Sequence, residues 1–323
     1  MHRLTSIARN FSHVTKNFKF AQNSSTLLVT FDNEANLNAL NHQMVNDLKE
    51  KINSFKPGLL ILAPSATSKA FCAGGDVKSI LSAIEKKNYA DADQFFADEY
   101  ALDFALARLN SKNTTTVALW KGHVMGGGVG VSINSTFRVA FNDSNFAMPE
   151  ARIGIFPDVG VTSTLSRMHR SLALSIGLFG HRLSGADLYL SGLATHFVDS
   201  SKFEAVKEEL KSLQIDNGKQ LQKSVEKILN NYSSEPDEVV RSKFENMVKT
   251  FDSALNKKTL EEIQESLDNA SDPLLKRLAD AMKINSPMSM RLFFEYLKWV
   301  QGKSLDQVFE ADYRLIKQLL RNG

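Results

Sequence analysis

The sequence predicts an α/β protein with a largely parallel sheet, followed by a helical C-terminal region. Through the first 200 residues, short all-apolar runs alternate with amphipathic stretches. That is the pattern of buried parallel strands joined by helices. Beyond about residue 200, apolar residues recur at helical spacing and no glycine-rich loop follows. We therefore predict a leading segment over 1–22, an α/β core with the chemistry over 23–200, and a helical region over 201–323.

Length and composition support a globular fold with a sizeable core. The chain has 323 residues, of which 43% are hydrophobic and 23% charged. No apolar run reaches the roughly 18 residues that a membrane span needs. Cys72 is the single cysteine, which excludes an intrachain disulfide and a cysteine-based zinc site. We interpret Cys72 as a small buried apolar residue, with a nucleophile as the alternative.

Local signals place the main elements. Asn41 is predicted to cap a helix whose Val45, Leu48 and Ile52 share one face and which ends before Pro57. Apolar runs predict strands over residues 25–31, 59–63, 116–120 and 137–141. Further helices are predicted from residue 77, over 91–109, along the stripe 274–282, from the Ser286 cap and over 305–316.

The first 31 residues contain no acidic side chain. Their basic residues are Arg3, Arg9, Lys16 and Lys19, and a helix would place Leu4, Ile7, Phe11 and Val14 on one stripe. This profile is typical of a mitochondrial presequence, so we expect residues 1–22 to act as one and the chain to reach the mitochondrial matrix. The alternative is a nucleic-acid-binding arm. Because the net charge of +3 falls to about −1 without these four residues, no direct nucleic-acid contact is expected.

Two glycine runs organise the chain. Glycines at 126–128 follow the strand 116–120 and open a helical stretch, and Gly74 and Gly75 precede the helix that starts near Val77. Glycines let a ligand approach bare backbone, and a helix N-terminus offers free N–H groups. Two such donors that converge form an oxyanion hole. The alternatives are a tight packing joint and, less favoured, a dinucleotide site, for which no acidic residue follows at the expected spacing.

Five sequence blocks follow one another along the chain: FCAGGD at 71–76, MGGGVG at 125–130, FAMPE at 146–150, FPDVG at 156–160 and ATHFV at 194–198. Taken in order, they resemble the enoyl-CoA hydratase/isomerase (crotonase) superfamily over residues 25–323, and within it they are similar to the branch of 3-hydroxyisobutyryl-CoA hydrolases. The resemblance implies a superhelix of ββα units with C-terminal helices and a coenzyme A thioester as ligand. We expect no cofactor, no metal and no membrane.

The resemblance also assigns roles to residues. The backbone amides of Gly75 and Gly127 would hold the thioester carbonyl. Glu150 would be the catalytic carboxylate, either activating water or attacking the thioester to give an anhydride. Asp158 would bind the 3-hydroxyl or handle the proton of the leaving thiolate, and Glu99 would complete the polar wall.

One position separates the reaction classes that the resemblance allows. Hydratases of the superfamily carry a second glutamate two residues after the glycine triplet, where this chain has Gly130. Hydrolysis of 3-hydroxyisobutyryl-CoA in valine breakdown is therefore expected, with 3-hydroxypropionyl-CoA as a further substrate. His123 and His196 match no catalytic position, and we expect both to pack.

Each implied acid has a structural alternative. Glu150 could be a buried hydrogen-bonded carboxylate, Asp158 a helix cap and Glu99 a solvent-facing side chain. The alternative function is a component of the small mitochondrial ribosomal subunit, derived from this hydrolase and with little activity. Members of the branch continue into a further tail beyond the helix of Tyr313, which keeps that alternative open. Self-association into a homo-oligomer is a separate possibility that the sequence leaves open.

Overall fold

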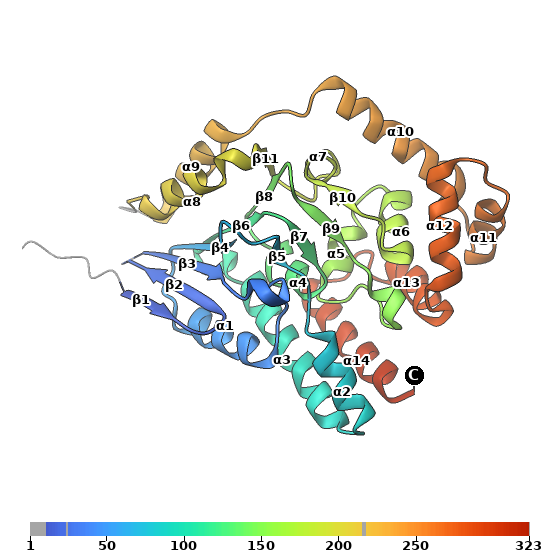
Figure 1. The fold of residues 1–323 in the computed structure, drawn as a ribbon, viewed down its shortest axis with the longest axis horizontal. Helices are drawn as coiled ribbons and strands as arrows, with labels where there is room; N and C mark the ends of the chain where they lie inside the picture. The colour runs from blue at the N-terminus through green and yellow to red at the C-terminus, as the bar shows by residue number, and fades with distance from the viewer. Residues whose placement is uncertain (1–10, 24, 215–217, 323) are drawn as a thin grey trace, which may run out of the picture.

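Two β-sheets and a shell of helices make up the protein (Figure 1). The computed structural model describes residues 11–23, 25–214 and 218–322. The larger sheet has the order β1 (Phe11–Val14), β2 (Phe18–Gln22), β3 (Thr26–Phe31), β4 (Leu59–Pro64), β6 (Thr115–Trp120), β8 (Phe137–Phe141) and β11 (His196–Val198). The smaller sheet has the order β10 (Leu183–Ser184), β9 (Asn145–Ala147), β7 (His123–Met125) and β5 (Ala70–Cys72).

Strand direction matches the prediction of a largely parallel core. All pairs from β3 to β11 in the larger sheet are parallel, and so are β5 with β7 and β7 with β9 in the smaller one. Antiparallel pairing is confined to β1 with β2, β2 with β3, and β9 with β10. In each sheet, the loops that follow the parallel strands therefore leave from the same edge.

Helices connect these strands and then build the C-terminal part. The first group is α1 (His42–Ser54), α2 (Val77–Glu85), α3 (Tyr89–Ala107), α4 (Gly127–Ile133), α5 (Val161–Leu165), α6 (Arg170–Phe179) and α7 (Gly185–Leu190). The second group is α8 (Phe203–Ser212), α9 (Gly218–Tyr232), α10 (Glu238–Leu255), α11 (Leu260–Asp268), α12 (Pro273–Ile284), α13 (Pro287–Trp299) and α14 (Leu305–Asn322). The predicted helical C-terminal region is confirmed.

The larger sheet is buried on both faces. Along β4, Leu60 and Leu62 belong to the main core with α1 and α3, whereas Leu59 and Ile61 face a second core under α8 and α9. This alternation explains why the strand is apolar at every position. Figure 1 shows α8 and α9 on one side of the sheet and α1 on the other.

The elements with strong local signals lie where they were predicted. Asn41 caps α1 by accepting the Met44 N–H at 2.9 Å, and Ser286 caps α13. Sequence reasoning missed the short strands β5, β7, β9 and β10, because runs of two or three residues have no readable period.

The boundary predicted after residue 22 falls at the end of a strand of the larger sheet. Residues 18–22 form β2 inside the larger sheet rather than the end of a basic helix, and β1 pairs with β2. The physical reason is burial: Phe18 and Phe20 pack with Phe31 in the main core. Residues 1–10 lie outside the described part of the chain, so the presequence prediction is restricted to the segment before β1.

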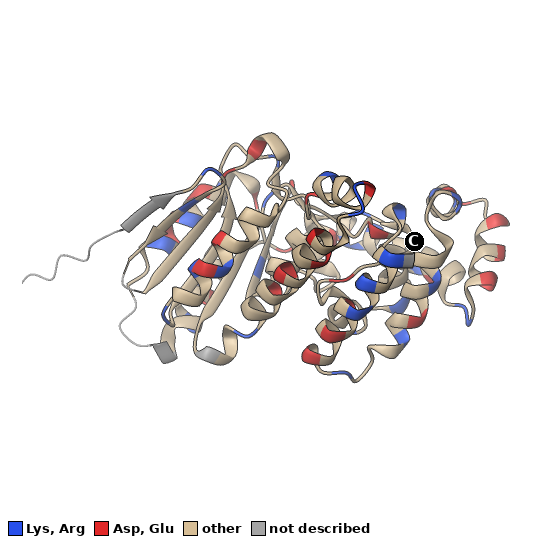
Figure 2. Ribbon diagram, turned by 90° about the horizontal axis from the view of Figure 1, so that it is seen from below, with Lys and Arg blue, Asp and Glu red and all other residues tan. Residues whose placement is uncertain are grey.

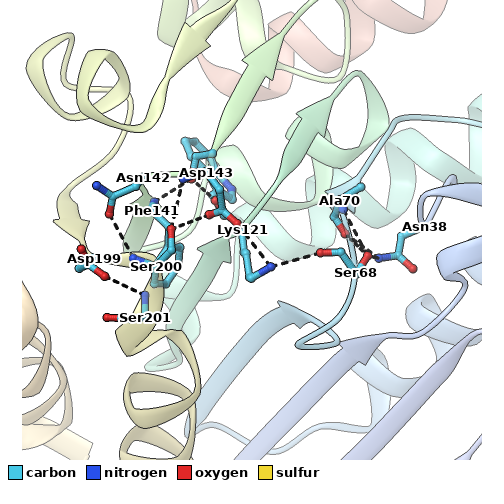
Figure 3. A network of polar contacts seen from close by, with 12 residues as sticks. Asn38, Ser68, Ala70, Lys121, Phe141, Asn142, Asp143, Asp199, Ser200 and Ser201 are labelled. Carbon is cyan, nitrogen blue, oxygen red and sulfur yellow. Dashed lines mark hydrogen bonds and ion pairs between the residues drawn. The ribbon is translucent and has the colours of Figure 1, made fainter.

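A polar network braces the strand ends around the smaller sheet (Figure 3). The Lys121 ammonium donates to the Ser68 carbonyl at 3.3 Å and pairs with Asp143 at 3.4 Å. Ser200 donates to Asp143 at 2.9 Å, and Asn38 donates to the Ser68 hydroxyl at 3.1 Å. The network thereby joins the loop before β5, the end of β6 and the turn between β8 and β9.

Figure 2 shows positions of basic and acidic residues interspersed along the helices. Within residues 11–23, 25–214 and 218–322, none of the helices is both long and apolar enough to cross a bilayer.

Replacing Phe18 by Ala tests whether β2 is part of the folded core. We expect the free energy of unfolding to fall by about 3–5 kcal/mol, because a fully buried aromatic ring is lost. The control is Lys19→Ala on the same strand, whose exposed ion pair with Asp32 is worth less than about 1 kcal/mol. Denaturant unfolding measures both variants, and equal small losses would contradict the assignment.

Candidate active site

Two glycine turns meet at one edge of the smaller sheet. Because β5 and β7 are parallel neighbours, the loops that follow them leave the sheet side by side. A Cβ atom built on Gly74 would lie 3.3 Å from the Met125 carbonyl oxygen, and one on Gly127 would lie 3.4 Å from the Gly75 nitrogen. The two backbones can approach this closely only because these positions carry no side chain.

Both turns present backbone N–H groups. Gly127 is the first residue of α4, so its N–H has no partner within the helix. Gly126 precedes it with φ 48° and ψ −123°, a conformation that glycine tolerates best. At the other turn, the Leu40 N–H donates to the Gly74 carbonyl and the Asp76 N–H donates to the Leu40 carbonyl. The Gly75 N–H takes no part in these two hydrogen bonds. The structure thus brings together the two residues predicted to supply an oxyanion hole.

Glu150 lies against the second turn. It follows β9 as the first residue of the short helix η3 (Glu150–Ile153), and it is 5% exposed. Its Oε1 would be 3.0 Å from a Cβ built on Gly126, and its Oε2 has no hydrogen-bond partner among the described residues. Burial, then the charges of Asp158 and Glu99, raise the pKa of Glu150 well above its usual range. Glu150 Oε2 therefore has a hydrogen-bonding capacity that no described residue uses.

Glu99 projects from α3 over both turns and is 3% exposed, so the solvent-facing alternative is wrong. A Cβ atom built on Gly127 would collide with its Oε1, and one on Gly75 would be 3.7 Å from the same oxygen. Burial, reinforced by the charge of Asp158, raises the pKa of Glu99 to about 8. Glu99 is therefore protonated at neutral pH.

Asp158 completes the group and is also buried. It does not cap a helix: Gly160 holds the N-cap position of α5, and Asp158 Oδ2 accepts a hydrogen bond from the Tyr100 hydroxyl of α3. Burial raises its pKa to about 6, and the Tyr100 hydrogen bond opposes that rise. The pKa of Asp158 therefore lies below that of Glu99.

Sequence reasoning missed Asp103, which lies one helical turn after Glu99. It is fully buried, and neither of its oxygens has a hydrogen-bond partner among the described residues. A Cβ built on Gly130 would collide with its Oδ2 and lie 2.7 Å from Val159 Cβ. The carboxyl group therefore closes the space that a side chain at position 130 would need. The spacing of four from Glu99 was a readable signal, since such residues share a helix face.

The other candidates from the sequence have packing roles. Cys72 is buried, and burial raises the pKa of its thiol to about 12, which argues against a thiolate nucleophile. His196 Nδ1 lies 2.9 Å from the Thr195 hydroxyl, and its ring packs against Phe137. His123 sits half-buried in β7. In the described part of the chain, no group of His, Cys, Asp and Glu side chains is arranged to hold a metal ion.

The arrangement combines two chemical abilities. Adjacent backbone donors can stabilise an oxygen that becomes negative, and a carboxyl group beside them can act on the carbon next to that oxygen. Together, these groups could promote the addition of a nucleophile to a carbonyl group.

Comparisons with known proteins agree with this geometry. The chain is 34% identical to human "3-hydroxyisobutyryl-CoA hydrolase, mitochondrial" over 302 residues, covering 92% of this chain and 76% of the relative. It is 30% identical to 3-hydroxyisobutyryl-CoA hydrolase 1 of Arabidopsis thaliana, covering 93% of this chain and 79% of that one. Among solved structures, a carnitinyl-CoA dehydratase from Mycobacterium thermoresistibile superposes with a TM-score of 0.83 at 27% identity, covering 95% of this chain and 87% of that chain.

An enoyl-CoA hydratase from Rhodobacter sphaeroides 2.4.1 shares the fold, with a TM-score of 0.79 at 23% identity over 94% of this chain and 85% of the other. The predicted crotonase-like fold is confirmed by these neighbours. Residues 26–323 match the model of the enoyl-CoA hydratase/isomerase family. The chain belongs to the enoyl-CoA hydratase/isomerase family.

Proposed function

We propose that this chain hydrolyses 3-hydroxyisobutyryl-CoA, and 3-hydroxypropionyl-CoA as a further substrate, to the free 3-hydroxy acid and CoA. The names and the identity of its relatives support the CoA thioester as substrate. The observation that carries the proposal is the Glu150 carboxyl beside the two glycine turns, with position 130 closed by Asp103. Several relatives are named as mitochondrial, which supports a role in valine breakdown in the mitochondrial matrix.

The two glycine turns would activate the thioester carbonyl. Its oxygen would accept hydrogen bonds from the Gly75 and Gly127 N–H groups. When a nucleophile adds to the carbonyl carbon, that oxygen becomes negative and both bonds strengthen. Each preorganised donor of this kind contributes about 3 kcal/mol to transition-state stabilisation.

Glu150 would act on the same carbonyl carbon by one of two routes. As a general base it takes a proton from water, whose oxygen forms the new C–O bond. As a nucleophile it forms a mixed anhydride, which water then hydrolyses. In both routes the C–S bond breaks, and the CoA sulfur leaves with the bonding electrons and is protonated. Both also require the ionised form of Glu150.

Asp158 and Glu99 would recognise the 3-hydroxyl of the substrate. Asp158 receives the Tyr100 hydrogen bond on one oxygen, so the other is available to accept from a hydroxyl. Glu99, protonated at neutral pH, can donate to that hydroxyl. A second glutamate for the addition of water to a double bond is missing at Gly130, which favours hydrolysis over hydration.

Replacing Glu150 by Ala or by Gln should lower thiol release from 3-hydroxyisobutyryl-CoA by at least about 100-fold, because the group that forms or activates the nucleophile is lost. The matched control is Arg152→Ala, an exposed residue on the same helical turn, which should keep wild-type turnover. Thiol release followed with a chromogenic thiol reagent measures all three, and full turnover by the Gln variant would assign the chemistry to another group.

The pH profile should show the coupling between Glu150 and Asp158. Because only ionised Glu150 reacts and its pKa is raised, kcat/KM should increase as the pH rises through that pKa. The Asp158 charge is one cause of the raised pKa, so Asp158→Asn should move the rising limb to lower pH while lowering its plateau. The control, Asp98→Asn, removes a carboxylate of α3 that pairs with His42 and Lys49, and it should leave the limb in place. A shift to higher pH in the Asp158 variant would refute the coupling.

Filling the meeting point of the two turns should abolish activity. In Gly127→Ala the new methyl group collides with Glu99 and crowds the Gly75 N–H, so we expect a loss of about 100- to 1,000-fold in kcat. Gly154→Ala serves as the control, because its methyl group meets no atom within 4 Å although its φ of +85° makes it the more strained backbone. Steady-state kinetics and thermal unfolding separate the two effects. Equal activity in both variants would argue against an oxyanion hole at this place.

A further inference from the structure

The C-terminal helix α14 contacts the site, and it carries a buried acid, Asp312, to the loop after Asp158. The helix packs against α3 and α5, the two elements that flank the carboxyl cluster, and Figure 1 shows it alongside α3. Asp312 is 0% exposed. Its Oδ2 accepts the N–H of Gly160 at 2.8 Å, and its Oδ1 lies 2.6 Å from the Tyr296 hydroxyl of α13.

The segment that Asp312 holds is conformationally strained. Val159 has φ +49° and Gly160 has φ +74°, so two consecutive residues after Asp158 are in the left-handed region. For a β-branched residue such as Val159 this conformation is unfavourable, and it persists only where the surroundings enforce it. The hydrogen bond from the Gly160 N–H to Asp312 helps to hold this conformation. It lies two residues from Asp158, the carboxylate proposed to bind the substrate.

The same helix also seals the loop and contacts the hydrogen-bond donor of Asp158. A Cβ built on Gly160 would lie 2.7 Å from the Phe309 ring of α14. The Tyr313 ring, also on α14, packs edge-on against Tyr100 with centroids 6.3 Å apart. Three residues of one helix thus touch either the loop that carries Asp158 or the tyrosine that donates to it.

Tyr296 of α13 holds Asp312 in turn. The Tyr296 hydroxyl donates to Asp312 Oδ1 at 2.6 Å and also lies 3.1 Å from the Val308 carbonyl oxygen. Burial raises the pKa of Asp312 to about 8, and the Tyr296 hydrogen bond opposes that rise.

We propose that Asp312 is a positioning residue of the active site, which fixes the Asp158 loop through Gly160 and makes α14 part of the catalytic apparatus. This inference rests on the proposed hydrolysis for its kinetic consequences. Its structural content, an enforced loop conformation at Gly160, is independent of the reaction.

The amide of asparagine can keep both contacts of Asp312, since its oxygen can accept from Gly160 and its NH₂ can donate to the Tyr296 hydroxyl oxygen. Leucine has a similar volume and reproduces neither. Asp312→Asn should therefore keep kcat within about threefold of wild type, whereas Asp312→Leu should lower kcat by about 100-fold with a smaller change in KM. Glu310→Ala, an exposed position on the same helix, is the matched control and should be unchanged.

Amide hydrogen exchange at Gly160 measures the contact with Asp312 directly. A role of Asp312 in stability elsewhere in the protein would not change the exchange rate at Gly160 specifically. We expect slow exchange in wild type, in Glu310→Ala and in Asp312→Asn, and faster exchange in Asp312→Leu. Should Asp312→Leu fail to fold, Tyr296→Phe replaces it. That variant frees one contact of Asp312 and should accelerate Gly160 exchange and lower kcat by a smaller factor.

Two outcomes would overturn the inference: wild-type kcat in a folded Asp312→Leu or in Tyr296→Phe, or an Asp312→Asn variant as impaired as Asp312→Leu. A wild-type protein that releases no thiol would refute the proposed function instead. In that case Gly160 exchange still decides the inference, because unchanged exchange in the variant that lacks the contact contradicts it.

Discussion

The site depends on one steric constraint, the contact between the two glycine turns that follow β5 and β7. Parallel pairing of these strands directs both loops to the same edge, and the absence of side chains at Gly74, Gly126 and Gly127 lets the backbones meet. Only then do two N–H groups come together and leave room for Glu99 and Glu150 above them. A methyl group at Gly127 would collide with the Glu99 carboxyl group, so the contact has no room for a side chain there.

The carboxyl groups around this contact share one electrostatic feature, a pKa that burial raises. An ionised carboxylate without a partner is costly to bury, and burial is the largest cause of the raised pKa values of Glu99, Asp103 and Glu150. Asp158 differs because Tyr100 donates a hydrogen bond to its ionised form. Burial thus raises the pKa of each of these four acids, and a side-chain hydrogen bond opposes that rise only at Asp158.

The helical third of the chain divides into two parts with different roles. Helices α8 and α9 cover the outer face of the larger sheet, and residues such as Val206 and Val225 form the second core there. Helices α13 and α14 instead pack against α5 and carry Tyr296 and Asp312 to the loop after Asp158. The sequence predicted one helical region without chemistry of its own, whereas the packing connects its last helix to the site.

The sequence alone determined those features that are encoded by neighbouring residues. Apolar runs, the Asn41 cap and the glycine runs are local signals, because strand burial, helix capping and backbone freedom act over a few residues. The order of the motif blocks was enough to predict the family and to name Glu150 as the candidate acid. Near the N-terminus the local signal is ambiguous, because the spacing of apolar residues fits both a basic helix and the strand that buries Phe18.

Only the tertiary structure decided which distant groups share the site. Asp312 meets Gly160 across 152 positions of the chain, and no local pattern reports such a contact. Asp103 was at readable spacing from Glu99, but its place beside Gly130 became apparent only when α3 and α4 were packed. The same holds for the raised pKa values, because the loss of solvent around a carboxyl group is a property of the folded molecule and not of its neighbours in sequence.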